Sequence, residues 1–346
     1  MDYIEIENQL GRWKLPRAFC SPKVGGTWDG STIAGVIGLV SEGLHLPPPR
    51  PQTAPNPIVR MMLDGLLFVA PDTVLCQERY VAETPAIILD VGAHIGSYSV
   101  LLSQILTTHK IYHKIYAVEA SPELFPCLKY SLEKNVDPQW GQSWSTNAAA
   151  VSTENSGKTT FFPAIQENAS GCAGQNAHSL EQVEGFTIPT VDLDSLNFEA
   201  CDVLKIDCEG GDLDVIKGAT KLIGKCRPLI LFECSCNAIS GRIVTPHSGS
   251  LMSGFDPTVP EVPAGFDELA PFFNILTSLN YIIFANPYWP NGDEWVATPL
   301  EKISQFVSHI ENQVLSLHGK ELLEGLAQEA LLMSGYFKDE SRKEEI

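Results

Sequence analysis

The middle of the chain alternates between short apolar runs and segments with helical spacing. Residues 87–92 are almost continuously apolar, as expected of a strand that is covered on both faces. Residues 97–106 follow with helical spacing, and residues 114–120 form the next predicted strand. The shared apolar face of the predicted helix comprises Val100, Leu101 and Ile105. Short connections between alternating strands and helices predict a parallel sheet with helices on both faces.

The alternation continues after the second strand. A helix is predicted to begin at Ser121, because this serine cap is followed by Pro122 in the first turn and by Glu123 at the positive end of the helix dipole. Pro126 lies unusually early in this helix. The segment 61–71 is interpreted as a short pair of strands with Asp64-Gly65 at the turn. Further strands are predicted at 144–152, 158–162, 203–207, 228–234 and 280–287, and further helices from about Asp212 and over 266–279.

Composition shifts divide the chain into three parts. Residues 47–57 hold six prolines in eleven residues, so this stretch must be extended and separates an N-terminal arm from the core. We predict an arm and linker over 1–57, a core over 58–299 with a glycine- and proline-rich lid at 239–265, and a helical extension over 300–346. The apolar stripe of that extension is expected to pack on the core or on a second subunit; it comprises Ile303, Phe306, Val307, Ile310 and Val314.

Bulk composition limits the partners and the compartment. The chain of 346 residues carries 42 acidic and 23 basic residues, a net charge of −19, and shows no basic cluster, so nucleic acid is not expected as a partner. No apolar run reaches about 18 residues, which argues against a membrane span. The first 17 residues contain early acids and no apolar signal core, and the nine cysteines form no CxxC pair. A cytoplasmic protein is therefore predicted.

The sequence DVGAHIG at 90–96 predicts a cofactor-binding turn between a strand and a helix. Glu119 ends the next predicted strand, where nucleotide-binding sheets carry a carboxylate that accepts hydrogen bonds from ribose. A nicotinamide-binding fingerprint needs a second glycine two residues after Gly92, and His94 stands there instead. S-adenosylmethionine has no phosphate and needs only one close approach by the turn, so the spacing favours it. An ordinary tight turn with a surface glutamate is the alternative.

The sequence LKIDCEGGDLDVIKGA at 204–219 places three charges at the end of a predicted strand. Side chains alternate along a strand, so Lys205 and Asp207 share one face. A buried ammonium needs a partner, and we expect Lys205 to be neutralised by carboxylates that end neighbouring strands. These carboxylates are Asp90, Asp207 and Glu233. The following Asp212 and Asp214 lie at the positive end of the next helix and are interpreted as structural.

These motifs resemble the FkbM family of S-adenosylmethionine-dependent methyltransferases. The resemblance covers residues 86–234, and its most specific part is VLKIDCEGGDLDVIKGA; Cys208 fills the variable position, and Asp212 replaces a more usual glutamate. The resemblance implies an α/β Rossmann-like class I methyltransferase fold with a seven-stranded, mostly parallel sheet and helices on both faces. It also implies methyl transfer, usually to an oxygen of a sugar or natural product.

By position, the resemblance assigns the cofactor site. The methionine and ribose side would be lined by Asp90, Gly92, Ala93, His94 and Gly96, with Glu119 on the ribose, Ala120 and Ser121 near the adenine, and Asn147 and Ala148 closing the adenine pocket. Asp207 would face the transferring methyl group.

An alcohol acceptor needs a general base or a metal to remove its proton. Asp207 is the first candidate for either task, and Glu209 and Glu233 are weaker candidates; if Mg²⁺ or another divalent metal is bound, Asp207 and Glu233 would hold it. His178 and His247 are interpreted as solvated loop residues. Two rival functions stay open: a nicotinamide-dependent oxidoreductase and a catalytically silent module that binds the cofactor or a protein partner. The acceptor is expected to be a small molecule.

Overall fold

The computed structural model describes residues 3–8, 11–16, 57–66, 74–155, 157–162, 172–173, 185–234, 266–286 and 294–303. The predicted lid at 239–265, the histidines at 178 and 247, and all of the predicted C-terminal helices beyond residue 303 lie outside these ranges.

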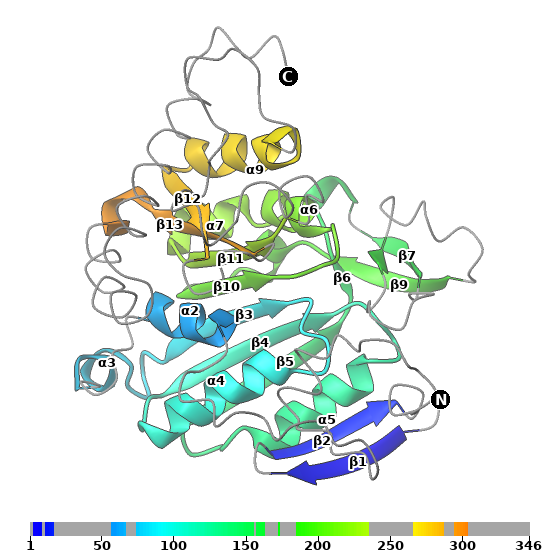
Figure 1. Ribbon diagram of the computed structural model, residues 1–346, viewed down its shortest axis with the longest axis vertical. Coiled ribbons are helices and arrows are strands. Elements are labelled where there is room, and N and C mark those ends of the chain that lie inside the picture. The colour runs from blue at the N-terminus through cyan, green and yellow to red at the C-terminus, as the bar shows by residue number, and fades with distance from the viewer. Residues whose placement is uncertain are drawn as a thin grey trace, which may run out of the picture.

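A seven-stranded sheet forms the centre of the fold (Figure 1). Its order is β12 (Tyr281–Ala285), β13 (Glu294–Pro299), β11 (Leu229–Glu233), β10 (Val203–Ile206), β3 (Ala86–Val91), β4 (His113–Glu119) and β5 (Gly141–Asn147). Strand β13 is antiparallel to both of its neighbours, β11 and β12. The strands β11, β10, β3, β4 and β5 pair in parallel. The mostly parallel, seven-stranded architecture predicted from the sequence is confirmed.

The order of strands along the sheet reverses between β3 and β10. From β3 the chain proceeds outward to β4 and β5, and it then returns to place β10 on the other side of β3. Open α/β sheets bind ligands at such a reversal, outside the carboxyl ends of the strands. The turn at 90–96 and the segment after β10 both lie at this point.

Helices cover both faces of the sheet (Figure 1). One face carries α2 (Pro57–Gly65), α4 (Ser97–Thr108) and α5 (Phe125–Asn135), and the other carries α6 (Asp212–Lys217), α7 (Thr220–Cys226) and α9 (Phe266–Ser278). The short helix α3 (Val74–Arg79) precedes β3. Buried side chains of the strands and helices form an apolar core on each side of the sheet.

Two smaller β structures flank the main sheet. Between β5 and β10 the chain forms a small sheet of β6 (Ala149–Ala150), β9 (Phe186–Val191), β7 (Lys158–Phe162) and β8 (Cys172–Ala173), followed by the 3-10 turn η5 (Leu193–Leu196). Near the N-terminus, β1 (Tyr3–Asn8) and β2 (Gly11–Pro16) form a hairpin against α5, in which Trp13 and Leu15 are fully buried. This part of the predicted arm therefore packs on the core.

Four sequence predictions about elements were wrong or shifted. The strand predicted at 144–152 is divided into β5, which begins at Gly141, and β6. Residues 61–65 of the predicted strand pair at 61–71 are instead the end of α2, whose apolar residues pack against β10 and β11, and residues 67–71 lie outside the described ranges. Helix α5 begins at Phe125 rather than Ser121; the serine hydroxyl caps the preceding turn by accepting from the Leu124 N–H at 3.2 Å. Pro126 then lies in the first turn of the helix, where no N–H is needed. The helix predicted from Asp212 is divided into α6 and α7.

The buried face of α4 also differs from the prediction. Val100 is buried as expected, but Leu102 and Leu106 are fully buried while Leu101 and Ile105 are only partly buried. Serines 99 and 103 share this buried face because each has a polar partner beneath it. The Ser103 hydroxyl lies 2.8 Å from Nε2 of the buried His113, whose Nδ1 lies 2.9 Å from the Ile111 carbonyl.

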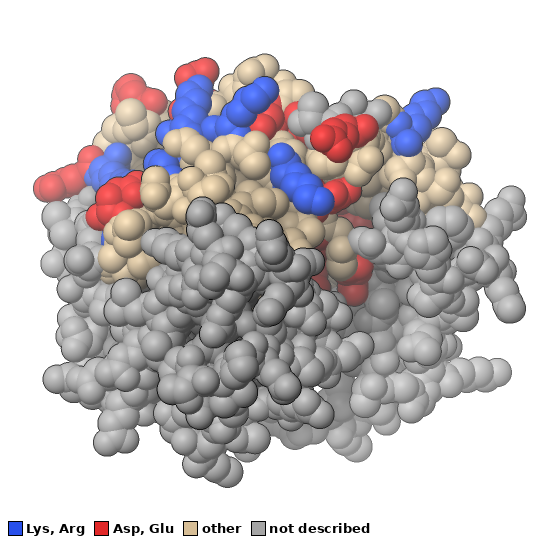
Figure 2. Space-filling model, turned by 90° about the horizontal axis from the view of Figure 1, so that it is seen from above, with Lys and Arg blue, Asp and Glu red and all other residues tan. Residues whose placement is uncertain are grey.

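The described part of the surface in Figure 2 carries charges of both signs. On the face drawn in Figure 2, the lysine and arginine side chains that are described lie among aspartates and glutamates. None of the helices in the described ranges has the length and apolarity that a bilayer crossing would need.

Candidate active site

The turn between β3 and α4 is built around two glycines. Gly92 has a φ of +72° and Gly96 a φ of +84°, a region that suits glycine. A side chain at Gly92 would place its Cβ 1.7 Å from the carbonyl oxygen of Asp207, and one at Gly96 would meet Leu128 at 2.9 Å. A glycine is thus required at position 92 because the backbone after β10 lies against it. From the sequence alone, a ligand explains the close approach at this turn instead.

Glu119 ends β4 and fixes the turn. Its Oε2 accepts from the backbone N–H of His94 and its Oε1 from the N–H of Ser121, each at 2.7 Å. His94 therefore contributes its backbone N–H to this turn. Burial raises the pKa of Glu119 to about 7, against the two N–H donors and Lys205, which lower it, and with Asp207 raising it further. A carboxylate has about four acceptor positions, so two are left for the two hydroxyls of a ribose.

The segments beside Glu119 are held by Asn147 at the end of β5. Its amide donates to the carbonyls of Glu119 at 2.8 Å and Ala120 at 3.2 Å, and the N–H of Ala148 also donates to the Glu119 carbonyl. The N–H of Ala93 donates to Val118 at 3.0 Å. The residues assigned to the ribose and adenine thus lie together at the ends of β3, β4 and β5.

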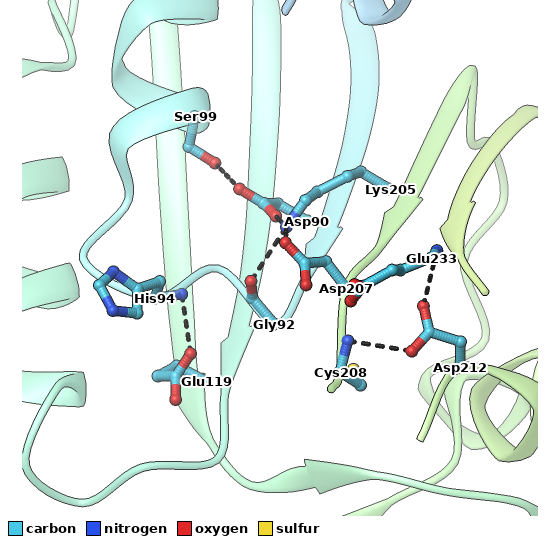
Figure 3. A network of polar contacts seen from close by, with 10 residues as sticks. All are labelled: Asp90, Gly92, His94, Ser99, Glu119, Lys205, Asp207, Cys208, Asp212 and Glu233. Carbon is cyan, nitrogen blue, oxygen red and sulfur yellow. Dashed lines mark hydrogen bonds and ion pairs between the residues drawn. The ribbon is translucent and has the colours of Figure 1, made fainter. Parts of the chain in front are cut away.

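Lys205 joins the two sides of the strand reversal (Figure 3). The register places it beside Asp90, and its side chain is only 1% exposed. Its ammonium lies 3.2 Å from Asp90 Oδ1 and 3.3 Å from Asp207 Oδ2, and it donates to the Gly92 carbonyl at 3.0 Å. Burial lowers the pKa of Lys205, but Asp207 and Asp90 raise it by more, so it lies well above its usual value. The predicted neutralisation is confirmed for Asp90 and Asp207, whereas Glu233, the third predicted partner, forms no ion pair with Lys205.

Asp90 and Asp207 differ in exposure. The Asp90 side chain is 1% exposed, and its Oδ2 also accepts from the Ser99 hydroxyl at 2.6 Å. The Asp207 side chain is 29% exposed, so this carboxylate is the part of the cluster that a ligand can reach. Asp90 lies behind the turn and contacts Lys205 and Ser99.

A row of carboxylates continues from Asp207 across the sheet. Lys205 pairs with Leu231 on β11. Asp207, directly after β10, and Glu233, the last residue of β11, each lie two residues beyond this pair and therefore share one face. Glu233 in turn pairs with Glu294 on β13. Burial raises the pKa of Glu233 to about 9, and Asp207, Asp212, Glu209 and Glu294 raise it further. Glu294 is a site residue that the sequence reasoning missed, because β13 was not predicted.

Asp212 has the structural role that was expected of it. It is buried at the start of α6, and its two oxygens accept from the N–H groups of Cys208 at 3.1 Å and Glu233 at 3.0 Å. Burial and Asp207 raise the pKa of Asp212 to about 7. Asp212 thereby ties the exit of β10 to the end of β11. Glu209, in the turn between Cys208 and Asp212, is exposed and has a φ of +51°.

The described residues do not complete a metal site around Asp207 and Glu233. Within those residues, no group of three or more histidine, cysteine, aspartate or glutamate side chains is arranged to hold a metal ion. Asp207 and Glu233, the two predicted ligands, lie on neighbouring strand ends.

The sheet has the architecture of class I methyltransferases. Its single antiparallel strand, β13, lies between β11 and β12, and its glycine turn after β3 faces Glu119. The family model of the methyltransferase FkbM domain matches residues 90–255, so the resemblance found in the sequence is confirmed over that segment.

Solved structures of methyltransferases are similar to this chain at low identity. Methyltransferase FkbM from Methylobacillus flagellatus KT has a TM-score of 0.39 and 15% identity, over 62% of this chain and 43% of that one. The O-methyltransferase from Bacillus cereus, solved with SAH, has a TM-score of 0.32 and 13% identity, over 71% and 91%. This chain spans 43% and 47% of the first two structures matched, the second being the citrinin polyketide synthase CMeT domain. The search of curated proteins found no match.

Proposed function

We propose that this protein is an S-adenosylmethionine-dependent methyltransferase that acts on a hydroxyl oxygen of a small molecule, such as a sugar or natural product. The observation that carries the proposal is the pairing of Glu119 with the glycine turn: both of its oxygens are oriented by backbone N–H groups at 2.7 Å, and each keeps room for one more donor. The FkbM domain match supports the same activity.

The residues fit the cofactor by their chemistry. Glu119 would accept from the two ribose hydroxyls, and the segment of Ala120 and Ser121, held by Asn147, would border the adenine. When bound, S-adenosylmethionine supplies a methyl group on a sulfonium, whose carbon–sulfur bond breaks with its electron pair left on sulfur. The turn at 90–96 would orient the methionine part.

Asp207 would remove the proton of the acceptor. Its carboxylate is partly exposed at the strand reversal, while Lys205 holds its Oδ2 from behind at 3.3 Å. As the acceptor oxygen forms its bond to the methyl carbon, the hydroxyl proton passes to Asp207. Positioning of the acceptor and removal of its proton are the two contributions that the protein must make.

Ligand-dependent thermal stability tests this function without knowledge of the acceptor. A ligand that binds only the folded state raises the melting temperature, by an amount that grows with its concentration relative to Kd. S-adenosylmethionine and S-adenosylhomocysteine at about 1 mM should raise the melting temperature by several degrees, and NAD should not. A shift with NAD alone would favour the oxidoreductase alternative. A shift with none of the three would overturn the proposal.

A further inference from the structure

We propose that Asp90, Lys205 and Asp207, here called the charge triad, select the sulfonium form of the cofactor over its neutral thioether product. This inference rests on the proposed function and concerns the same site. It assigns to Lys205 the task of setting the net charge at the strand reversal.

The composition of the triad is unusual for the centre of a sheet. All four residues of β10 are buried, and the neighbours of Lys205 along its strand are apolar. Buried ion pairs seldom stabilise a fold more than apolar side chains of similar volume, because desolvation of the charges offsets their attraction. Stability alone therefore does not explain a lysine with two aspartates at this position, and a role in binding does.

The triad carries an unbalanced charge. One ammonium contacts two carboxylates, at 3.2 Å and 3.3 Å, which leaves one net negative charge (+1 − 2 = −1). Asp90 is 1% exposed and Asp207 is 29% exposed, so the excess negative charge is presented to a ligand by Asp207. The Lys205 bond to Gly92 and the contact of Gly92 with the Asp207 carbonyl hold the triad against the cofactor turn.

The sulfonium would lie close to this charge. Glu119 places the ribose at the end of β4, and β3 and β10 are the next two strands. Adjacent strands are about 4.8 Å apart, so the group attached to the ribose reaches the strand reversal. Unit charges at such distances attract strongly in a partly buried site.

The charges also balance across the reaction. Before transfer, the negative charge of Asp207 faces a sulfonium cation. The acceptor oxygen then bonds to the methyl carbon, the carbon–sulfur electron pair stays on sulfur, and the acceptor proton passes to Asp207. Both charges are thus lost together, which removes the attraction that held the cofactor and favours departure of the product.

Calorimetric affinities of S-adenosylmethionine and S-adenosylhomocysteine test the triad without any acceptor. Asp207→Asn brings the net charge to zero and should weaken S-adenosylmethionine roughly ten- to hundredfold, with S-adenosylhomocysteine changed by less than about threefold. Asp90→Asn/Lys205→Met removes one charge of each sign and leaves a net charge of −1, so the affinity ratio should stay near that of the wild type.

Three further variants complete the design. Lys205→Met makes the net charge of the triad more negative, −2 instead of −1, and should increase the preference for S-adenosylmethionine; if it does not fold, as judged by circular dichroism, Asp207→Asn and the double variant still decide. Ser99→Ala removes a contact to Asp90 without changing charge, and Glu199→Gln changes an exposed charge that is 88% accessible. Both should leave the ratio unchanged.

The outcomes separate this inference from the proposed function. If the wild type binds neither molecule, the function itself is wrong. If it binds both but Asp207→Asn keeps the wild-type ratio, or the double variant behaves like Asp207→Asn, the charge triad does not discriminate and the proposed function stands.

Discussion

Glu119 accepts from the backbone N–H groups of His94 and Ser121, and we propose that it also accepts from the ribose hydroxyls of the cofactor. In Glu119→Ala the ribose loses charge-assisted hydrogen bonds, and S-adenosylmethionine affinity should fall by about 1–3 kcal/mol. Calorimetry measures this directly. Glu123→Gln, in the following turn, is the matched control and should bind normally. An unchanged affinity in Glu119→Ala would remove the ribose assignment.

Asp207 is the residue that we propose takes the proton of the acceptor. Asp207→Asn keeps the shape of the side chain and removes the proton acceptor, so single-turnover methyl transfer at saturating cofactor should slow by about 10²–10⁴. Asp214→Asn, in the first turn of α6, changes a carboxylate that contacts Asn155 and Lys217 and should transfer normally. Full turnover by Asp207→Asn would leave the strand end with a structural role only.

The sequence predicts some residues of the candidate site but not others. Glu119, Lys205 and Asp207 follow from sequence because a charge at the end of an apolar strand must face a ligand or a partner. The reason for Gly92 could not be predicted, since it depends on the carbonyl of Asp207, 115 residues later, pressing on the turn. Glu294 could not be found either, because its meaning comes from pairing with Glu233 on a different strand.

The connection between β3 and α4 is the element on which the site depends. Gly92→Ala forces a side chain into a positive-φ position where its Cβ would meet a backbone oxygen. It should lower the free energy of unfolding by at least about 1–3 kcal/mol and abolish cofactor-induced stabilisation. Urea unfolding with and without S-adenosylmethionine measures both effects.

Gly224 supplies the control for that substitution. It lies within α7, and a Cβ there would meet nothing within 4 Å. Gly224→Ala should raise the free energy of unfolding by about 0.5–1 kcal/mol, because alanine is the better helix former. Equal effects of the two substitutions would mean that the turn does not need a glycine at position 92.

The sequence predicted most strands of the main sheet and helix α9, but it did not predict helix α2 or strand β13. Strands β3, β4, β10, β11 and β12 and helix α9 lie close to their predicted ranges. Helix α2 was mistaken for strands because a short, mostly apolar run fits either structure. Strand β13 was missed because it is buried at all six positions, so it has no alternation, and because an antiparallel partner cannot be inferred from local sequence.

At the level of the whole molecule, the sheet gathers acidic groups at one edge. Five of the seven strands bring a carboxylate to this edge, at Asp90, Glu119, Asp207, Glu233 and Glu294, and Lys205 forms ion pairs with two of them, Asp90 and Asp207. Such an arrangement opposes folding whenever all of the carboxylates are ionised. A ligand with a positive charge relieves this repulsion, so binding and stability are linked through the same edge.

This edge gives the unfolding free energy a specific dependence on pH. The folded-state pKa values of Glu119 and Asp212 are raised to about 7 and that of Glu233 to about 9, by burial first and by neighbouring carboxylates second. In the unfolded chain these groups titrate near pH 4. The folded state thus holds more protons than the unfolded state between these limits, and stability must fall as pH rises through 7 toward 9.

Glu233→Gln isolates the largest of these contributions. Without ligand, the wild type should lose on the order of 2–3 kcal/mol of unfolding free energy between pH 6.5 and 9, and Glu233→Gln should lose clearly less, because glutamine has no proton to release. Urea unfolding followed by circular dichroism, in the presence of a reductant, measures the slope. The exposed Glu199→Gln should keep the wild-type slope. If Glu233→Gln keeps it as well, Glu233 is ionised in the folded protein, and the row of carboxylates does not retain a proton.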